Sequence, residues 1–269
     1  MASQKQREKK RAAETKVERV KAEEAGRVEA SAPSFFESLT EGKLLFFVVA
    51  SAVLVYANSL SGEFLFDDTK QIVGNPTLDS WGNIWRAFVG AVWDFQRDTG
   101  TNEIPPPYYR PFFTVYLILG YKLFGLWPAG WHLLSVAAHA GATALVYFFL
   151  KRLSGSRAVS ATAALMFGLH PTHTESVSWI SGIPDPLMAL FFLPALIWYE
   201  RFRAGDGRRY FVWSVAAFAV AVFCKETALA LPVFVAFREV FFGDGRFVER
   251  VRRTALRLVP YAAVSALYL

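Results

Sequence analysis

Long apolar runs separated by short charged clusters dominate the pattern of this sequence. The runs cover residues 43–59, 112–127, 131–150, 158–171, 186–199, 210–224, 227–242 and 257–269. A helix needs about 20 mainly apolar residues to cross the hydrocarbon core of a bilayer. Several runs approach that length and others are shorter. The pattern therefore predicts an all-α, polytopic membrane protein rather than one or two water-soluble domains.

Basic residues between the runs predict how the chain is oriented. Loops that face the cytoplasm carry an excess of lysine and arginine. Three such clusters are Lys151, Arg152 and Arg157, then Arg201, Arg203, Arg208 and Arg209, and finally Arg246, Arg250, Arg252, Arg253 and Arg257. Residues 1–42 are also basic and have little to bury, which predicts a disordered cytoplasmic tail. All four segments are expected on the cytoplasmic side.

A chain that leaves the cytoplasm near Lys43 and returns by Lys151 must cross the membrane an even number of times. Three apolar runs lie between these points, so one of them does not cross. The run 112–127 is the weakest candidate, because it is short and contains Lys122. We expect it to form a helix at the outer interface. The count then gives about seven transmembrane helices and a large first outer loop, residues 60–130, that carries juxtamembrane helices.

Aromatic residues in this outer loop follow a helical spacing. Trp81, Trp85, Phe88 and Val92 fall at positions i, i+4, i+7 and i+11, which share one face of an α-helix. Interfacial helices are typically rich in aromatic residues on their apolar face. The spacing predicts an interfacial helix, and the alternative is ordinary packing within a folded insert.

Composition supports the membrane assignment and limits the chemistry. Of the 269 residues, 54% are hydrophobic, against about 45–50% in typical soluble proteins. The net charge of +6 comes from basic residues between the runs, so it does not indicate nucleic-acid binding. The single cysteine, Cys224, excludes an intrachain disulfide and a zinc cluster built on cysteines. The last run is too short to span, so residues 43–269 are expected to be an incomplete transmembrane domain.

Two adjacent carboxylates, Asp67 and Asp68, follow the first apolar run in an aromatic setting. Neighbouring carboxylates repel each other, which raises the pKa of one of them unless a cation intervenes. Such a pair suits a general base or the ligands of a divalent metal. The alternative is a turn that holds two solvated acids.

Two further apolar runs are bounded by basic residues that suit a phosphate, Arg110 and Lys225. Arg110 precedes the run 112–127, and its guanidinium can fork onto a phosphate; the alternative is snorkelling to lipid headgroups. Lys225 and Glu226 lie between two runs with almost no turn. Ionisable groups at membrane depth are functional candidates. Lys225 suits a lipid phosphate, and the alternative is an ion-paired hairpin.

His170, His173 and Glu175 close the run 158–171, and Asp185 precedes the next run. The first three resemble a zinc ligand set, but Pro171 bends the chain between them. A hydrogen-bonded polar cluster at the end of a helix is the favoured interpretation. All these candidates reach the outer side by the count above. They predict a cavity with an electropositive part and a carboxylate part, which suits a lipid-phosphate donor and a hydroxyl acceptor.

Four segments, in this order, resemble a known family. They are residues 58–75 (NSLSGEFLFDDTKQIVGN), 109–111 (YRP), 170–175 (HPTHTE) and 224–227 (CKET). In order and rough spacing they resemble the transmembrane-and-tetratricopeptide-repeat O-mannosyltransferase-like proteins of the glycosyltransferase C superfamily. The resemblance covers about residues 43–242.

This resemblance implies a glycosyltransferase C-like fold and transfer of a sugar, such as mannose, from a polyprenyl-phosphate donor to a hydroxyl, commonly of a protein serine or threonine. It implies that Asp67 or Asp68 is the base and that Arg110 and Lys225 hold the donor phosphate. The residues expected to shape the sugar or acceptor pocket are His170, His173, Glu175, Asp185 and Glu226. A divalent metal, with Asp67 and Asp68 as candidate ligands, is left open.

The chain departs from the family pattern at two points. Residues 182–185 read GIPD where the family often has Gly-Arg-x-Asp, so an arginine is missing there. The C-terminal repeats are absent, so a truncated product is expected. The expected location is a bacterial inner (plasma) membrane, with a cytoplasmic N-terminus, a periplasmic site and membrane lipids as partners. The alternatives are a polyprenyl-lipid transporter and a non-enzymatic membrane scaffold.

Overall fold

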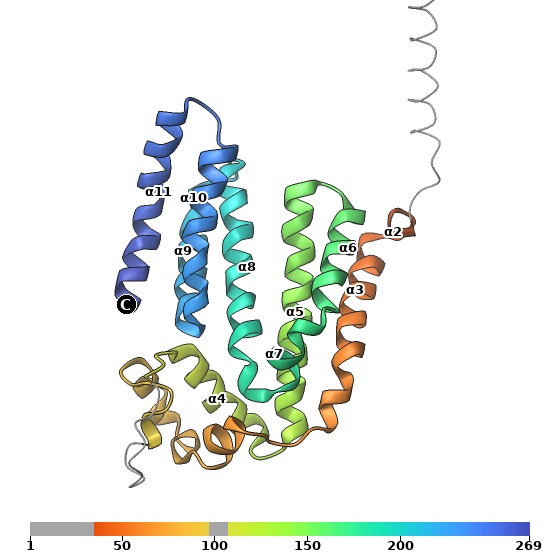
Figure 1. Cartoon of the computed structure of the whole chain (residues 1–269), viewed down its shortest axis with the longest axis vertical. Coiled ribbons are helices and arrows are strands. Elements are labelled where there is room, and N and C mark those ends of the chain that lie inside the picture. Colours follow the sequence, from red (N-terminus) through yellow and green to blue (C-terminus); the bar gives the residue numbers. More distant parts are fainter. Residues whose placement is uncertain (1–34, 97–106) are drawn as a thin grey trace, which may run out of the picture. The chain divides into compact units, whose positions relative to one another are not determined.

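The computed structural model describes residues 35–96 and 107–269, and every regular element within these ranges is helical (Figure 1). The chain divides into a first unit, Met1–Thr40, and a second unit, Glu41–Leu269. In the first unit a short helix, α2 (Phe35–Ser38), is described. Residues 1–34 of the predicted cytoplasmic tail lie outside the described residues. All candidate site residues belong to the second unit.

The second unit is built from helices of very different length. The α-helices are α3 (Glu41–Tyr56), α4 (Pro111–Phe124), α5 (Pro128–Ser154), α6 (Arg157–Gly168), α7 (Thr174–Ser178), α8 (Pro184–Arg203), α9 (Arg208–Cys224), α10 (Ala230–Phe242) and α11 (Phe247–Tyr268). Short 3₁₀ turns connect them: η1 (Ala57–Ser61), η3 (Pro76–Asp79), η4 (Trp81–Asn83), η5 (Trp85–Phe88), η6 (Asp94–Gln96), η7 (Pro171–His173), η8 (Ile180–Gly182) and η9 (Glu226–Leu229). One π-helical turn, η2 (Thr69–Val73), follows the Asp67–Asp68 pair.

Proline and glycine set several helix boundaries. Pro111, Pro128 and Pro184 stand in the first turns of α4, α5 and α8, where a missing backbone N–H is tolerated. Helix α5 ends at Gly155, which has a φ of 70°, and the Gly155 N–H donates to the Lys151 carbonyl at 3.0 Å. Because glycine has no Cβ, it adopts this left-handed conformation without strain. Gly155 therefore explains why the chain turns from α5 into α6 at this point.

Within the described residues, three helical stretches are long and apolar enough to cross a membrane: Glu41–Ser61, Pro128–Ser154 and Ile180–Arg203. The chain is therefore a multi-pass membrane protein. Helix α4 has 14 residues, about 21 Å of helix, which is shorter than a hydrocarbon core of about 30 Å. Its predicted position at the interface agrees with that length. The count of about seven spans stays a prediction.

The long helices of the second unit run side by side, with α5 in contact with α3, α6 and α8 (Figure 1). Helix α8 packs along α9, and α10 packs along α11. An apolar core around Tyr199, Phe218 and Tyr261 joins α8, α9, α10 and α11. A second core around Phe113 and Trp131 joins the 60–96 segment, α4 and the start of α5. The second core supports the segment that carries the candidate site.

The two ends of these helices carry different residues. The basic clusters lie at the connections from α5 to α6, from α8 to α9 and from α10 to α11, at the upper end in Figure 1. At this end Lys151 of α5 forms an ion pair with Glu41 of α3. The candidate site residues lie at the opposite end, where α4 and the segment after α3 cover the helices (Figure 1). Neighbouring helices run in opposite directions, so successive connections lie at opposite ends of the helices.

The interfacial helix predicted through Trp81 is wrong. Residues 81–88 form two separate 3₁₀ turns, η4 and η5, rather than one α-helix. Gly82 and Gly90 lie in this segment, and glycine is a poor helix former. Trp81 and Trp85 are exposed, whereas Val92 is buried in the second core. These residues therefore do not share one face, and Val92 supports the folded segment from within.

Candidate active site

A pocket of about 260 Å³ opens at the end of the helices opposite the basic clusters. We call it the polar pocket. Its walls come from the loop after α3, the segment before α4, the turns around α7, the start of α8 and the end of α9. Five residues singled out from the sequence line it: Asp67, Arg110, Glu175, Asp185 and Lys225. Residues that are far apart in the sequence therefore surround one cavity.

Asp68 is buried and is not among the residues that line the polar pocket. Its Oδ1 accepts hydrogen bonds from the Ser181 N–H at 2.8 Å and from the Ser181 hydroxyl. Its Oδ2 accepts a hydrogen bond from the Leu65 N–H at 3.1 Å. Burial raises the pKa of Asp68, and the hydrogen bonds from Ser181 and Leu65 partly offset that rise. Asp68 therefore ties the loop after α3 to the η8 turn before α8.

Replacing Asp68 by alanine should loosen both loops without removing a side chain from the polar pocket. The change leaves the Leu65 N–H and the Ser181 donors unpaired, which costs about 1–3 kcal/mol. Backbone amides of these loops should exchange with deuterium about 5- to 150-fold faster. Hydrogen–deuterium exchange in detergent micelles measures this, with Glu63→Ala, an exposed acid of the same loop, as control. Equal protection in Asp68→Ala and in the unchanged protein would refute the tether.

Asp67 is half-buried and lines the polar pocket, and its carboxylate makes no hydrogen bond or ion pair within the described residues. The preceding residue, Phe66, has a φ of 48° and is 81% exposed. A positive φ is strained for a bulky residue other than glycine and often marks a functional turn. This turn leads into the two neighbouring acids, of which Asp68 is buried and Asp67 borders the cavity.

An apolar groove of about 440 Å³ adjoins the polar pocket. It is lined by Leu65, Phe66, Asp67, Thr174, Glu175, Ser178 and Trp179. Asp67, Glu175 and Trp179 line both cavities. The Trp179 indole N–H also donates to the Leu65 carbonyl at 3.4 Å, which holds one wall of the groove to the other. The two cavities therefore meet at two carboxylates.

Arg110 and Glu226 form a two-point ion pair at the edge of the polar pocket. The Arg110 Nε and one terminal nitrogen donate to the two carboxylate oxygens of Glu226 at 2.9 and 2.6 Å. The Arg110 guanidinium also lies 4.7 Å from the centre of the Tyr108 ring. Burial opposes ionisation of Glu226, but the Arg110 hydrogen bonds and the charges of Arg110 and Lys225 outweigh it, so the pKa of Glu226 is lowered. Glu226 is not among the lining residues, and it positions Arg110.

Lys225 forms the second ion pair of the polar pocket. Its Nζ donates to Asp185 Oδ1 at 2.6 Å, and the Ser176 hydroxyl donates to Asp185 Oδ2 at 3.3 Å. The backbone of Lys225 is extended between α9 and η9. The sequence left an ion-paired hairpin open for Lys225 and Glu226, and both residues do form ion pairs. The partners, however, are Asp185 and Arg110 rather than each other.

The two histidines of the 170–175 segment are not among the residues that line the polar pocket. His170 Nδ1 accepts a hydrogen bond from the Thr172 N–H at 3.2 Å, and the His170 carbonyl accepts one from the Tyr56 hydroxyl at 2.9 Å. The His173 ring packs against Phe167 and against His139 of α5. Burial lowers the pKa of His173, the nearby His170 lowers it further, and Asp185 opposes this. Glu175 lines both cavities, as described above.

The described residues contain no group of three or more His, Cys, Asp or Glu side chains that could hold a metal ion. The two oxygens of Asp68 already accept three hydrogen bonds. A divalent metal held by Asp67 and Asp68 stays a prediction. The polar pocket itself is lined by three carboxylates, from Asp67, Glu175 and Asp185, and by two cations, from Arg110 and Lys225.

Several lining residues were not predicted as site residues from the sequence. They are Gln71, Trp93, Tyr108, Ser176, Trp179 and Ser181, and Gln71 lies inside the motif 58–75. Tyr108 and Ser176 each adjoin one of the four motifs, and that position was the only sign in the sequence that they line the pocket. Ile183 stands where the family often has arginine, and it is fully buried in the second core. The side chain at this position therefore offers no hydrogen-bond donor to a phosphate.

The fold and the two cavities define an all-helical, multi-pass membrane protein with a joined polar and apolar site at one end. Its sequence is similar to curated proteins named protein O-mannosyl-transferases. It is 30% identical to mouse TMTC3 over 203 residues, which are 74% of this chain and 21% of the relative. It is 30% identical to human TMTC4 over 223 residues, which are 74% of this chain and 28% of the relative. It is 32% identical to tmtc2 of Xenopus laevis over 200 residues, 71% of this chain and 23% of the relative.

These matches confirm the resemblance seen in the four motifs as distant homology to the TMTC O-mannosyltransferases. The chain spans about a fifth to just over a quarter of the length of these curated relatives. No protein-family model matches the chain. No solved structure matches it either.

Proposed function

We propose that this chain is a glycosyltransferase that moves a sugar from a polyprenyl-phosphate donor to a hydroxyl group of a protein serine or threonine. The names of the homologues support mannose as the sugar. The observation that carries the proposal is the junction of the polar pocket and the apolar groove at Asp67 and Glu175. A lipid-linked sugar has a charged phosphate, a polar sugar and an apolar tail, and the two joined cavities match that division.

Asp67 is the proposed general base. It lines both cavities and has no partner within the described part of the chain, so its oxygens can accept a proton. The acceptor hydroxyl gives its proton to Asp67 while its oxygen attacks the anomeric carbon of the sugar. The bond from that carbon to the phosphate oxygen breaks, and the electron pair leaves with the lipid phosphate. Glu175 faces the same junction and is the proposed acceptor-site acid.

Arg110 and Lys225 are the proposed phosphate ligands. An arginine carries five N–H donors, of which Glu226 takes two, and a lysine carries three, of which Asp185 takes one. Donors therefore remain for the oxygens of a phosphate. The developing charge on the leaving phosphate needs such cations. Glu226 and Asp185 hold the two cations in place, since each forms a short ion pair with one of them.

The membrane arrangement belongs to the same proposal. Residues 43–269 act as a glycosyltransferase C-like domain with about seven spans and a cytoplasmic N-terminus. The site faces the periplasm of a bacterial inner membrane. Support comes from the separation of the basic clusters and the polar pocket at opposite ends of the helices. Cysteine accessibility labelling in spheroplasts tests the orientation, since a cysteine at exposed Lys70 should react from outside and one at exposed Arg208 should not.

Transfer of mannose tests the function directly. The full chain is reconstituted in liposomes with radiolabelled mannosyl-phosphoryl-polyprenol and a peptide rich in serine and threonine. We expect the label on serine or threonine of the peptide, located by mass spectrometry. A fluorescent polyprenyl phosphate measures leaflet exchange in parallel. Fast leaflet exchange without a labelled peptide would show a transporter instead of an enzyme. The absence of both activities would refute the proposal.

A further inference from the structure

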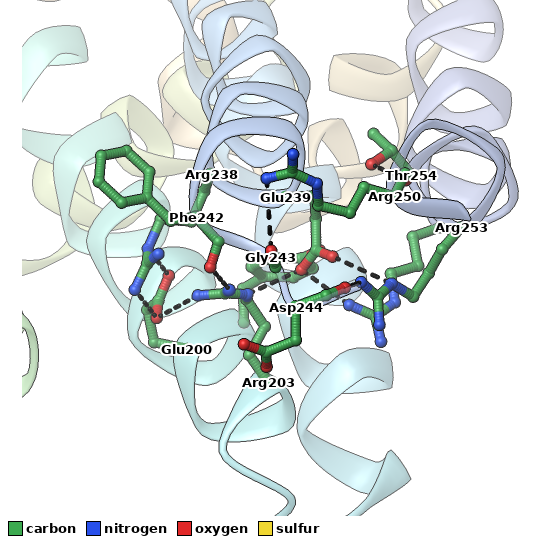
Figure 2. Close-up of polar contacts among 12 residues, drawn as sticks. Glu200, Arg203, Arg238, Glu239, Phe242, Gly243, Asp244, Arg250, Arg253 and Thr254 are labelled. Atoms are coloured by element: carbon green, nitrogen blue, oxygen red, sulfur yellow. Dashed lines mark hydrogen bonds and ion pairs between the residues drawn. The ribbon is translucent and has the colours of Figure 1, made fainter. Parts of the chain in front are cut away.

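A cluster of arginines lies at the end of the helices opposite the polar pocket. Five arginines, Arg203, Arg238, Arg250, Arg253 and Arg257, surround two buried carboxylates, Glu200 and Glu239 (Figure 2). We call this group the arginine cluster. It joins the end of α8, the end of α10 and the first half of α11. Five positive charges against two negative ones leave an excess of positive charge.

Three of these arginines already satisfy the two glutamates. The Arg203 Nε and an Arg257 nitrogen each lie 2.7 Å from Glu239 Oε1. The Tyr199 hydroxyl donates to the same oxygen at 2.9 Å. The Arg238 Nε lies 3.0 Å from Glu200 Oε1. Arg203, Arg238 and Arg257 are therefore the counter-ions of this buried pair of acids.

The other two arginines are less closely paired: Arg250 forms no ion pair among the described residues, and Arg253 forms only a long one. One Arg250 nitrogen donates to the Gly243 carbonyl at 3.4 Å, and one Arg253 nitrogen donates to the Asp244 carbonyl at 2.6 Å. The Arg253 Nε is 3.7 Å from Glu239, and the Nε atoms of Arg250 and Arg253 are buried without a hydrogen bond (Figure 2). The two residues stand three apart on α11, so their side chains are neighbours on one face. Together they present two charged forks whose one anionic contact among the described residues is the 3.7 Å approach of Arg253 to Glu239.

The end of α10 and the start of α11 carry exposed apolar side chains, and the Arg250 guanidinium lies 5.8 Å from the centre of the Phe247 ring. Phe241 and Phe242 at the end of α10 and Phe247 and Val248 at the start of α11 are each at least 60% exposed. In a multi-pass membrane protein, exposed apolar side chains next to arginines indicate the boundary between acyl chains and headgroups. A soluble anion would use the arginines and leave these apolar side chains unused. A phospholipid uses both.

We propose that Arg250 and Arg253 bind the phosphate of an anionic phospholipid at the membrane surface, with its acyl chains against Phe241, Phe247 and Val248. Arginine forks match the geometry of phosphate oxygens. A basic residue near an anionic membrane surface contributes about fivefold to binding. Two such residues therefore give about a 25-fold preference for an anionic headgroup over a zwitterionic one. The site is separate from the proposed sugar transfer and does not depend on it.

Lipid binding in detergent micelles tests the proposal. Native mass spectrometry of the full chain titrated with phosphatidylglycerol or phosphatidylcholine gives the affinity for each lipid. We expect tighter binding of phosphatidylglycerol, and we expect Arg250→Gln/Arg253→Gln to lose about 25-fold of that affinity while its phosphatidylcholine affinity stays constant. The matched control is Arg208→Gln/Arg209→Gln, which removes the same charge from exposed positions at the start of α9. It should keep the preference.

Two results would overturn the proposal. One is an equal affinity of the unchanged protein for phosphatidylglycerol and phosphatidylcholine, which does not depend on how any variant folds. The other is competition by inorganic phosphate at the same concentration as phosphatidylglycerol, because the site would then bind a free anion. Arg250→Lys/Arg253→Lys adds a graded result. It keeps the charge and loses the forks, so an intermediate affinity supports the proposed geometry.

Discussion

Replacing Asp67 by asparagine is expected to slow sugar transfer by about 10²- to 10⁴-fold, the range that a general base contributes. Asparagine has nearly the same shape as aspartate but cannot take the proton of the acceptor hydroxyl. Asp67 makes no hydrogen bond or ion pair in the described part of the chain, so its replacement should leave the fold intact. The measurement is the initial rate of mannose transfer to the peptide, with the donor concentration varied to separate kcat from KM.

The pattern across variants makes this prediction specific. Glu63→Gln removes an exposed acid of the same loop and should keep the rate of the unchanged protein. Asp67→Asn should lower kcat and leave the KM for the donor nearly constant, because Arg110 and Lys225 are the proposed donor ligands. A rate within about threefold of the unchanged protein is far less than a general base contributes, and it would exclude Asp67 as the base. Glu175, the other acid that borders both cavities, would then be the next candidate.

Replacing Glu239 by glutamine should destabilise the protein by about 3–5 kcal/mol, the usual cost of breaking a buried ion pair on one side. Glu239 is 1% exposed and is the counter-ion of Arg203 and Arg257. With glutamine at this position, both arginines keep their charge and lose this buried carboxylate, and Arg203 retains only Glu200 as a counter-ion. The Tyr199 hydroxyl also loses a charged acceptor. We expect a large drop in Tm, measured by thermal unfolding in detergent.

The control for Glu239 is a neighbouring acid with no such role. Asp244 is exposed at the turn between α10 and α11, and its side chain makes no ion pair among the described residues. Asp244→Asn removes the same formal charge and should change the Tm little, because exposed charges contribute little to stability. Equal Tm values for Glu239→Gln and Asp244→Asn would show that the arginine cluster does not hold α8, α10 and α11 together.

Five of the nine residues proposed from the sequence line one pocket, and their partners were not predicted. The apolar runs and the basic clusters indicated helices with two distinct ends, and the structure has the basic clusters at one end and Arg110, Glu175 and Lys225 at the other. The helical spacing from Trp81 failed, because glycines interrupt the segment and the chain folds there into short turns. Spacing describes which residues share a face only if a helix forms.

The pair Asp67 and Asp68 shows most clearly what a local pattern leaves open. Two adjacent acids looked equivalent in the sequence. In the structure, Asp68 accepts hydrogen bonds from Ser181, 113 residues away, while Asp67 borders both cavities. Two of the three donors to Asp68 come from Ser181 in η8, so the packing of η8 against this loop distinguishes the two acids.

The sequence alone determined that this chain is helical, that it belongs in a membrane and that its polar residues gather at the ends of its helices. These properties depend on the composition of continuous segments, because a bilayer selects apolar runs and a helix repeats every 3.6 residues. The tertiary structure decided which charges meet. Arg110 pairs with Glu226 across 116 residues and Lys225 with Asp185 across 40. Those partners depend on which helices pack together, and the composition of the separate segments does not specify that packing.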